Sequence, residues 1–127
     1  MNFAGRYFLD FAREVQASAW PRGGCTMAAE RSIISRAYYA VFWAARETIV
    51  RRGQTISDGA GAHQEVINVF EDWAERDPTC AEIADALISL RRDRNRADYE
   101  PIANITGEIP FVLESARRLL DRLKGLG

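Results

Sequence analysis

Residues 31–53 have the sequence RSIISRAYYAVFWAARETIVRRG, and this stretch decides the fold because its pattern predicts one long helix with two different faces. At about 100° per residue, apolar side chains recur along one face, which we expect to be buried. These side chains are Ile34, Ala37, Tyr38, Val41, Phe42, Ala45 and Ile49. With Thr26 as N-cap and Gly53 just beyond the end, the helix is predicted to span residues 27–52.

The opposite face of this helix carries hydroxyls, guanidinium groups and large aromatic rings instead of the Glu and Lys of a plain surface helix. Its residues are Ser32, Ser35, Arg36, Tyr39, Trp43 and Arg46. Such a stripe indicates that this face contacts a second partner, in addition to the core on the apolar face. For Tyr39 and Trp43 we expect packing at an interface, with stacking on nucleic-acid bases as the alternative. Arg36 is expected to pair with Asp98 or to lie at the same interface.

The remaining sequence shows further helical patterns over residues 3–19, 63–76 and 78–99 and in a last segment capped by Thr106, with Pro110 in its first turn. A glycine-rich segment, residues 53–62, separates two pairs of helices. The sequence therefore predicts an all-α protein, an antiparallel up-and-down helical bundle of four to five helices, forming a single domain over residues 1–127.

Composition limits the classes of function. The chain has 127 residues and a formal net charge of -1, which argues against coating nucleic acid through bulk charge. No apolar run approaches the roughly 18 residues that would span a bilayer, so we expect a cytoplasmic protein without a membrane partner. Cys25 and Cys80 are far apart and His63 is the single histidine, so the sequence predicts no metal site, no disulfide and no cofactor.

One position breaks the pattern of the helix predicted over residues 78–99. Its apolar stripe is Ile83, Leu87 and Leu90, and the next turns along the same stripe place Arg94 and then Asp98. Burying an unpaired guanidinium costs several kcal/mol. Arg94 is therefore expected either to pair, with Asp98 one turn further on as the nearest carboxylate, or to open onto a polar cleft.

Three patterns occur together in this order: SRAYYAVF at residues 35–42, HxxVxxxF at residues 63–70 and LRRDRNRADY at residues 90–99. In order and spacing they resemble the HEPN superfamily, in the branch often encoded beside a minimal nucleotidyltransferase. The resemblance implies a helical bundle that forms a homodimer. It also implies that the arginine motifs of the two copies meet at the dimer interface and form a metal-independent RNA-cleaving site.

Carried over to this sequence, the resemblance places Arg94 at the motif arginine and Asn95 at the polar position after it. Where the family's ribonucleases have a histidine, this chain has Tyr99. The implied roles are phosphate binding by Arg94, a nearby hydrogen bond from Asn95, orientation of Arg94 by Asp98, and proton transfer by Tyr99 or His63. The residues expected at the RNA or at the dimer interface are Arg36, Tyr39, Trp43, Arg91 and Arg96.

Three hypotheses follow from this pattern. The first is a toxin-like endoribonuclease, and the second is an inactive HEPN partner that binds a nucleotidyltransferase antitoxin or a nucleotide. The third is a structural helical module. Tyr99 favours the second, because a tyrosine with a pKa near 10 is only about one part in a thousand ionised at pH 7. For His63, the structural alternative to catalysis is a ring bonded to a neighbouring backbone group.

Overall fold

The computed structural model describes residues 24–99 and 108–126, excluding the side chains of residues 24–29 and 99. Its helices are α2 (Gly24–Arg51), α3 (Ala62–Trp73), α4 (Pro78–Tyr99) and α5 (Ile109–Gly125). The described residues contain no strand, and the predicted all-α class is confirmed. The helix predicted over residues 3–19 lies outside the described residues.

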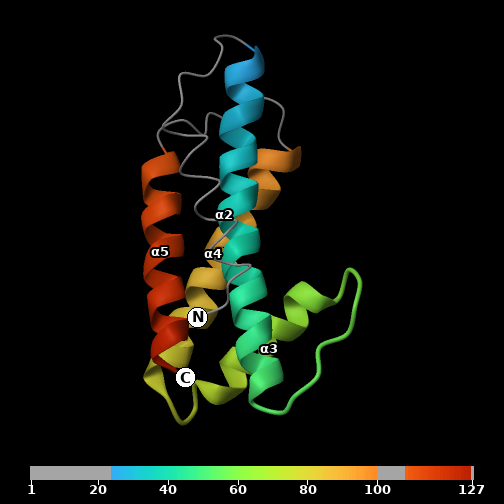
Figure 1. Cartoon of the computed structure of the whole chain (residues 1–127), viewed down its shortest axis with the longest axis vertical. Coiled ribbons are helices and arrows are strands. Elements are labelled where there is room, and N and C mark those ends of the chain that lie inside the picture. Colours follow the sequence, from blue (N-terminus) through green and yellow to red (C-terminus); the bar gives the residue numbers. More distant parts are fainter. Residues whose placement is uncertain (1–23, 100–107, 127) are drawn as a thin grey trace.

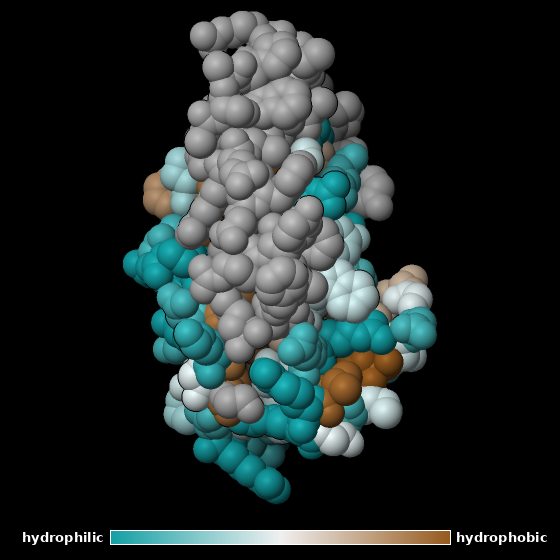
Figure 2. All heavy atoms as spheres, in the orientation of Figure 1, coloured by the Kyte–Doolittle hydropathy of each residue, from teal (hydrophilic) through white to brown (hydrophobic). Residues whose placement is uncertain are grey.

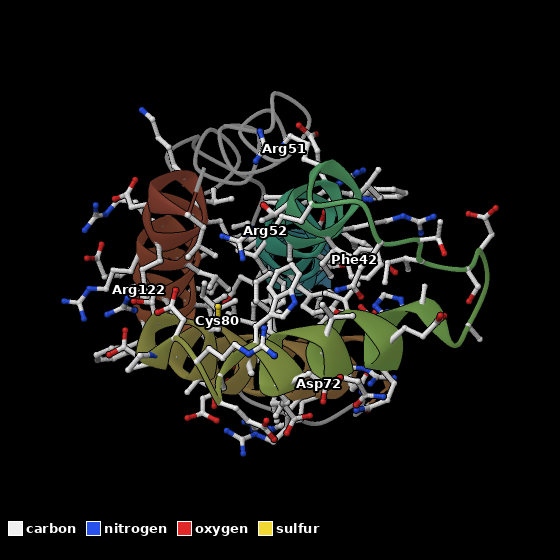
Figure 3. The ribbon with its side chains drawn as sticks, turned by 90° about the horizontal axis from the view of Figure 1, so that it is seen from below. Phe42, Arg51, Arg52, Asp72, Cys80 and Arg122 are labelled. Carbon is white, nitrogen blue, oxygen red and sulfur yellow. The ribbon has the colours of Figure 1, made fainter. Side chains whose placement is uncertain are left out.

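The helices form an antiparallel bundle, as predicted. Helices α2, α4 and α5 lie side by side and alternate in direction, while α3 crosses obliquely at the lower end of α2 (Figure 1). Both α2 and α4 pack against each of the other three helices. Seen from below, α2 and α5 lie on one side of the core, and α3 with the start of α4 lies on the other (Figure 3). Helix α3 therefore packs against both α2 and α4.

The core forms around the apolar face of α2. All of the positions that the helical pattern predicts to be inside are buried: Ile34, Ala37, Tyr38, Val41, Phe42, Ala45 and Ile49. Opposite them, Leu87 and Leu90 of α4 and Leu119 of α5 are also buried, and each such side chain contributes roughly 1.5–3 kcal/mol through removal from water. Outside, the visible surface over α5 and the lower end is mostly hydrophilic (Figure 2).

Two helix ends differ from the predicted ones. Helix α2 begins at Gly24, so Thr26 lies in its first turn and is not its N-cap. Helix α3 ends at Trp73, earlier than predicted, and a turn follows in which the backbone N–H of Asp77 donates to the Trp73 carbonyl at 3.0 Å. Pro78 disfavours helical geometry at Asp77, so α3 and α4 cannot run on as one continuous helix.

Helix α5 begins later than predicted. Its N-cap position is Glu108, whereas Thr106, the predicted cap, lies outside the described residues. Pro110 falls in the first turn, where a missing N–H costs nothing, as predicted. The Glu108 side chain makes no capping hydrogen bond and instead pairs with Arg96 of α4 at 2.7 Å. This ion pair ties the start of α5 to the end of α4.

The loop between α2 and α3 turns at two glycines. Gly53 has a φ of 91° and Gly59 a φ of 104°, a backbone region that side chains other than glycine rarely adopt. Arg46 of α2 holds the loop through its ion pair with Asp58 at 2.9 Å. The loop prediction is confirmed, and the consequence is that α3 starts beside the middle of α2, with His63 near its N-terminus.

Removing the N-cap of α4 should destabilise the protein. The Asp77 carboxylate accepts a hydrogen bond from the backbone N–H of Thr79 at 2.9 Å, at the N-terminus of the helix that carries Arg94. We expect Asp77→Ala to lower the free energy of unfolding by about 1 kcal/mol in urea denaturation. Asp85→Ala, at an exposed position of the same helix, is the control, and equal effects of the two substitutions would contradict the capping role.

Candidate active site around Arg94

Arg94 continues the buried stripe of α4 and is held there by polar partners. Its side chain is only 13% exposed, and its Nη1 lies 3.5 Å from Oδ2 of Asp98, one turn further along the helix. The same nitrogen donates to the hydroxyl of Tyr39 on α2 at 3.3 Å. Of the two alternatives that the sequence left open for Arg94, a partner or a polar cleft, the structure shows the first: Arg94 pairs with Asp98, and also with a tyrosine that the sequence did not assign to it.

Two tyrosine rings of α2 surround the Arg94 guanidinium. Its Cζ lies 5.3 Å from the ring centroid of Tyr38 and 5.5 Å from that of Tyr39, within the range of cation–π attraction. The Arg94 Nε is buried and has no hydrogen-bond partner among the described residues. A buried donor without an acceptor is uncommon in proteins. A ligand with an anionic oxygen would satisfy it.

His63 joins this cluster from α3. Its Nδ1 lies 2.6 Å from the hydroxyl of Tyr38, and its ring packs on Phe42 at a centroid distance of 4.4 Å. We expected a backbone partner if the histidine were structural, and that expectation is wrong because the start of α3 lies directly over Tyr38. Tyr38 was predicted only as a core residue. Its hydroxyl links His63 to the tyrosine ring on which Arg94 lies.

The electrostatics of the cluster fix the protonation states near neutral pH. Burial lowers the pKa of His63 below its usual value of 6.5, and the positive charges of Arg94 and Arg91 lower it further. Burial raises the pKa of Tyr38 to about 12, against the opposing effect of the same two arginines. His63 is therefore neutral and Tyr38 protonated. In the tautomer in which Nδ1–H donates to the Tyr38 oxygen, Nε2 is the nitrogen that can accept a substrate proton.

A groove between α2 and α4 collects one group of the predicted site residues. It has a volume of about 460 Å³, and Arg36 and Tyr39 of α2 line it together with Asp98 of α4. Arg31 also lines it and donates a hydrogen bond to the Ala97 carbonyl. Both hydrogen-bond partners of Arg94 thus line this groove, together with Arg36.

A second groove, between α3 and α4, is lined by other predicted site residues. It has a volume of about 620 Å³ and is lined by Arg91, Asn95 and Arg96 of α4 and by Gln64 of α3, with Arg91 donating to Gln64 at 3.3 Å. Asn95 follows Arg94 in sequence, but about 100° of helical rotation turns it toward this groove. The structure therefore separates Asn95 from the partners of Arg94.

Trp43 lines neither groove. Trp43 is 40% exposed on α2, and the Arg46 guanidinium lies 5.4 Å from its ring centroid. It continues the stripe of Tyr39 one turn further along the helix. Tyr99 is the last residue of α4, and its side chain lies outside the described residues.

Within residues 24–99 and 108–126, no group of three or more His, Cys, Asp or Glu side chains is arranged to hold a metal ion. No helix in the same ranges is long and apolar enough to cross a membrane. Compared with known proteins, the chain matches no model of a protein family, and no curated protein is significantly similar to it in sequence.

Proposed function

We propose that this protein is a HEPN-type, toxin-like endoribonuclease that cleaves RNA without a metal ion, at a site completed by a homodimer. The observation that carries the proposal is the meeting of Arg94 and His63 at Tyr38. The Arg94 guanidinium lies 5.3 Å from the Tyr38 ring centroid, and the Tyr38 hydroxyl lies 2.6 Å from His63. A phosphate-binding cation and a neutral imidazole are therefore held close together by a third side chain.

The reaction that fits these groups is attack by the RNA 2′-oxygen on the adjacent phosphorus. A bond forms from the 2′-oxygen to phosphorus, the bond to the 5′-oxygen breaks, and the products are a 2′,3′-cyclic phosphate and a 5′-hydroxyl. Arg94 stabilises the charge that develops on the phosphate oxygens, and its buried Nε gains an acceptor. Asp98 orients Arg94, and His63 or Tyr99 takes the 2′-hydroxyl proton, which that residue or the solvent then returns to the departing 5′-oxygen.

The proposal is tested with RNA incubated with the purified protein in excess EDTA. Cleavage is expected to continue, because no step uses a metal ion. Tyr99→His, which restores the histidine that the resemblance implies, should raise the rate, since a base with a pKa near 6.5 is largely neutral at pH 7. RNA left intact by both proteins would contradict the ribonuclease proposal.

The second candidate function is a catalytically inactive HEPN partner of a nucleotidyltransferase. Tyr99 at the histidine position favours it, because a tyrosine is a poor base at neutral pH. The same EDTA experiment separates the two candidates. Intact RNA together with a stable complex of this protein and a nucleotidyltransferase would support the second.

A homodimer is predicted from the exposed stripe of α2. Trp43 is 40% exposed beside Arg46, and tryptophan and arginine are enriched where interfaces are energetically strongest. Light scattering at tens of micromolar should give the mass of two chains. Trp43→Ala should weaken the dimer by about 2 kcal/mol or more. Phe111→Ala, which removes a 77% exposed ring from α5, is the control. A native monomer would contradict this prediction.

A further inference from the structure

The groove between α3 and α4 combines three kinds of surface that occur together in few places on a protein. Its lining side chains are basic (Arg91, Arg92 and Arg96), apolar (Ile67 and Ile88) and amide (Gln64 and Asn95). The volume of about 620 Å³ lies within the range of small-ligand sites. A ligand of this groove would have to match all three surfaces.

Arg91 and Arg92 favour an anionic ligand in this groove. Neither Arg91 nor Arg92 forms an ion pair with a carboxylate of the described residues; Arg91 donates to Gln64 at 3.3 Å and Arg92 to Ser89 at 3.4 Å. The Nε of Arg91 is also buried without a hydrogen-bond partner in the described part of the chain. Arg96, by contrast, is paired with Glu108 at 2.7 Å. Two adjacent guanidinium groups without carboxylates suit a phosphate, which arginine binds through two parallel hydrogen bonds.

The apolar side chains of the groove favour a ligand that also has a flat, uncharged group. Ile88 is 44% exposed although it lies next to guanidinium groups, and Ile67 is buried beneath the groove. Ile88 is thus the exposed apolar side chain on an otherwise polar lining. A nucleobase has the required flat face, while a bare phosphate or sulfate would leave Ile88 in water.

The amides indicate which base. The Gln64 amide is already engaged, because its Nε2 donates to Asn68 at 2.9 Å and its Oε1 accepts from Arg91. Asn95 is exposed and makes no hydrogen bond with the described residues, so its donor and its acceptor are both available. One donor beside one acceptor on an amide complements the N6 and N7 edge of adenine.

We infer that the α3–α4 groove binds an adenine nucleotide unit, with its phosphate on Arg91 and Arg92, its base on Ile67 and Ile88, and its base edge read by Asn95. This inference rests on the proposed function, since it identifies the RNA segment next to the scissile phosphate. Arg94 directly precedes Asn95 in α4, but its hydrogen-bond partners line the other groove, so a strand held in the α3–α4 groove must cross α4 to bring its next phosphate to Arg94.

Binding is tested with 2′-O-methyl oligonucleotides, which lack the attacking hydroxyl and cannot be cleaved. By fluorescence anisotropy, an adenine hexamer should bind about tenfold more tightly than uracil or cytosine hexamers, the discrimination typical of one good amide–base pair. Asn95→Ala should remove this preference. The double variant Arg91→Ala, Arg92→Ala should weaken binding of every sequence. Arg118→Ala, on the exposed face of α5, is the matched control and should change nothing.

The outcomes separate this inference from the ribonuclease proposal. An unchanged base preference in Asn95→Ala, or no binding of any hexamer or of adenosine monophosphate, would overturn the inference even if RNA is cleaved. Binding that depends on Asn95 without any RNA cleavage would contradict only the ribonuclease proposal and would support the adenine-binding groove. If adenosine monophosphate displaces the hexamer at similar affinity, the ligand of the groove is a free adenine nucleotide. If it does not displace the hexamer, the ligand is an RNA strand.

Discussion

Arg94→Ala is expected to slow RNA cleavage by about 10²–10³-fold, the loss typical when one group that stabilises transition-state charge is removed. Arg94 has a fixed orientation, since Asp98 and Tyr39 hold its Nη1, and its buried Nε has no partner among the described residues. The rate is measured under single-turnover conditions, so that product release does not mask the chemical step.

Two further variants show whether the effect is chemical. Arg94→Lys keeps the charge but not the planar fork of donors, and we expect it to recover only part of the lost rate. Arg118→Ala removes an arginine from the outer face of α5, where it pairs with Glu114, and should leave the rate unchanged. Circular dichroism must show native helicity for each protein. An Arg94→Ala protein that is folded and cleaves at the native rate would contradict the assigned role.

His63→Ala is expected to reduce the cleavage rate by about 10²–10⁴-fold if His63 is the general base, the usual contribution of a positioned proton acceptor. Tyr38 orients the imidazole through Nδ1, at 2.6 Å, and leaves Nε2 for the substrate. Tyr38→Phe keeps the ring under Arg94 but removes the hydroxyl, so it should lower the rate by less than His63→Ala does. Equal rates for native protein and His63→Ala would assign the proton transfer to Tyr99.

The pH dependence gives an independent check on His63. Its pKa is lowered from 6.5 by burial and by Arg94 and Arg91, so the neutral base persists to a lower pH than in a free histidine. The cleavage rate should therefore be constant just below pH 6.5 and fall only as the pH passes the lowered pKa. This acidic limb should be missing in His63→Ala.

The lowered pKa of His63 also makes the free energy of unfolding depend on pH. The unfolded chain binds the His63 proton more readily than the folded protein does, so acid favours unfolding. The stabilisation is fully present above the unfolded pKa of about 6.5 and is lost as the pH falls toward the folded value. Thermal unfolding followed between pH 7 and the lowered pKa should show this loss, and a flat profile would contradict it.

The periodic pattern of α2 was sufficient to predict the bundle. Tyr38, Val41 and Ile49 follow the geometry of a single helix, and a helix with one continuous apolar face must pack on others. Arg94 was predicted in the same way, as a charge on a core stripe that requires a partner one turn away, and Asp98 is that partner. Both predictions succeed because they concern neighbours within one helix.

The contacts between helices could not be predicted in this way. His63 and Tyr38 are separated by a glycine-containing loop, and their hydrogen bond depends on where that loop returns α3 to the bundle. The separation of Asn95 from Asp98 into two grooves likewise depends on which helices flank α4. The start of α5 at Ile109 depends on Pro110, and on an ion pair of Glu108 with another helix.

The central claim is tested most directly by the ends of the RNA fragments. A short RNA is incubated with the native protein in EDTA, beside the same RNA with one 2′-deoxynucleotide at the cleaved position, and the fragment masses are measured. We predict fragments ending in a 2′,3′-cyclic phosphate from the first RNA and no cleavage at the modified position of the second. Cleavage at the 2′-deoxynucleotide, or fragments ending in a 3′-hydroxyl, would contradict attack by the neighbouring 2′-oxygen at the Arg94 site.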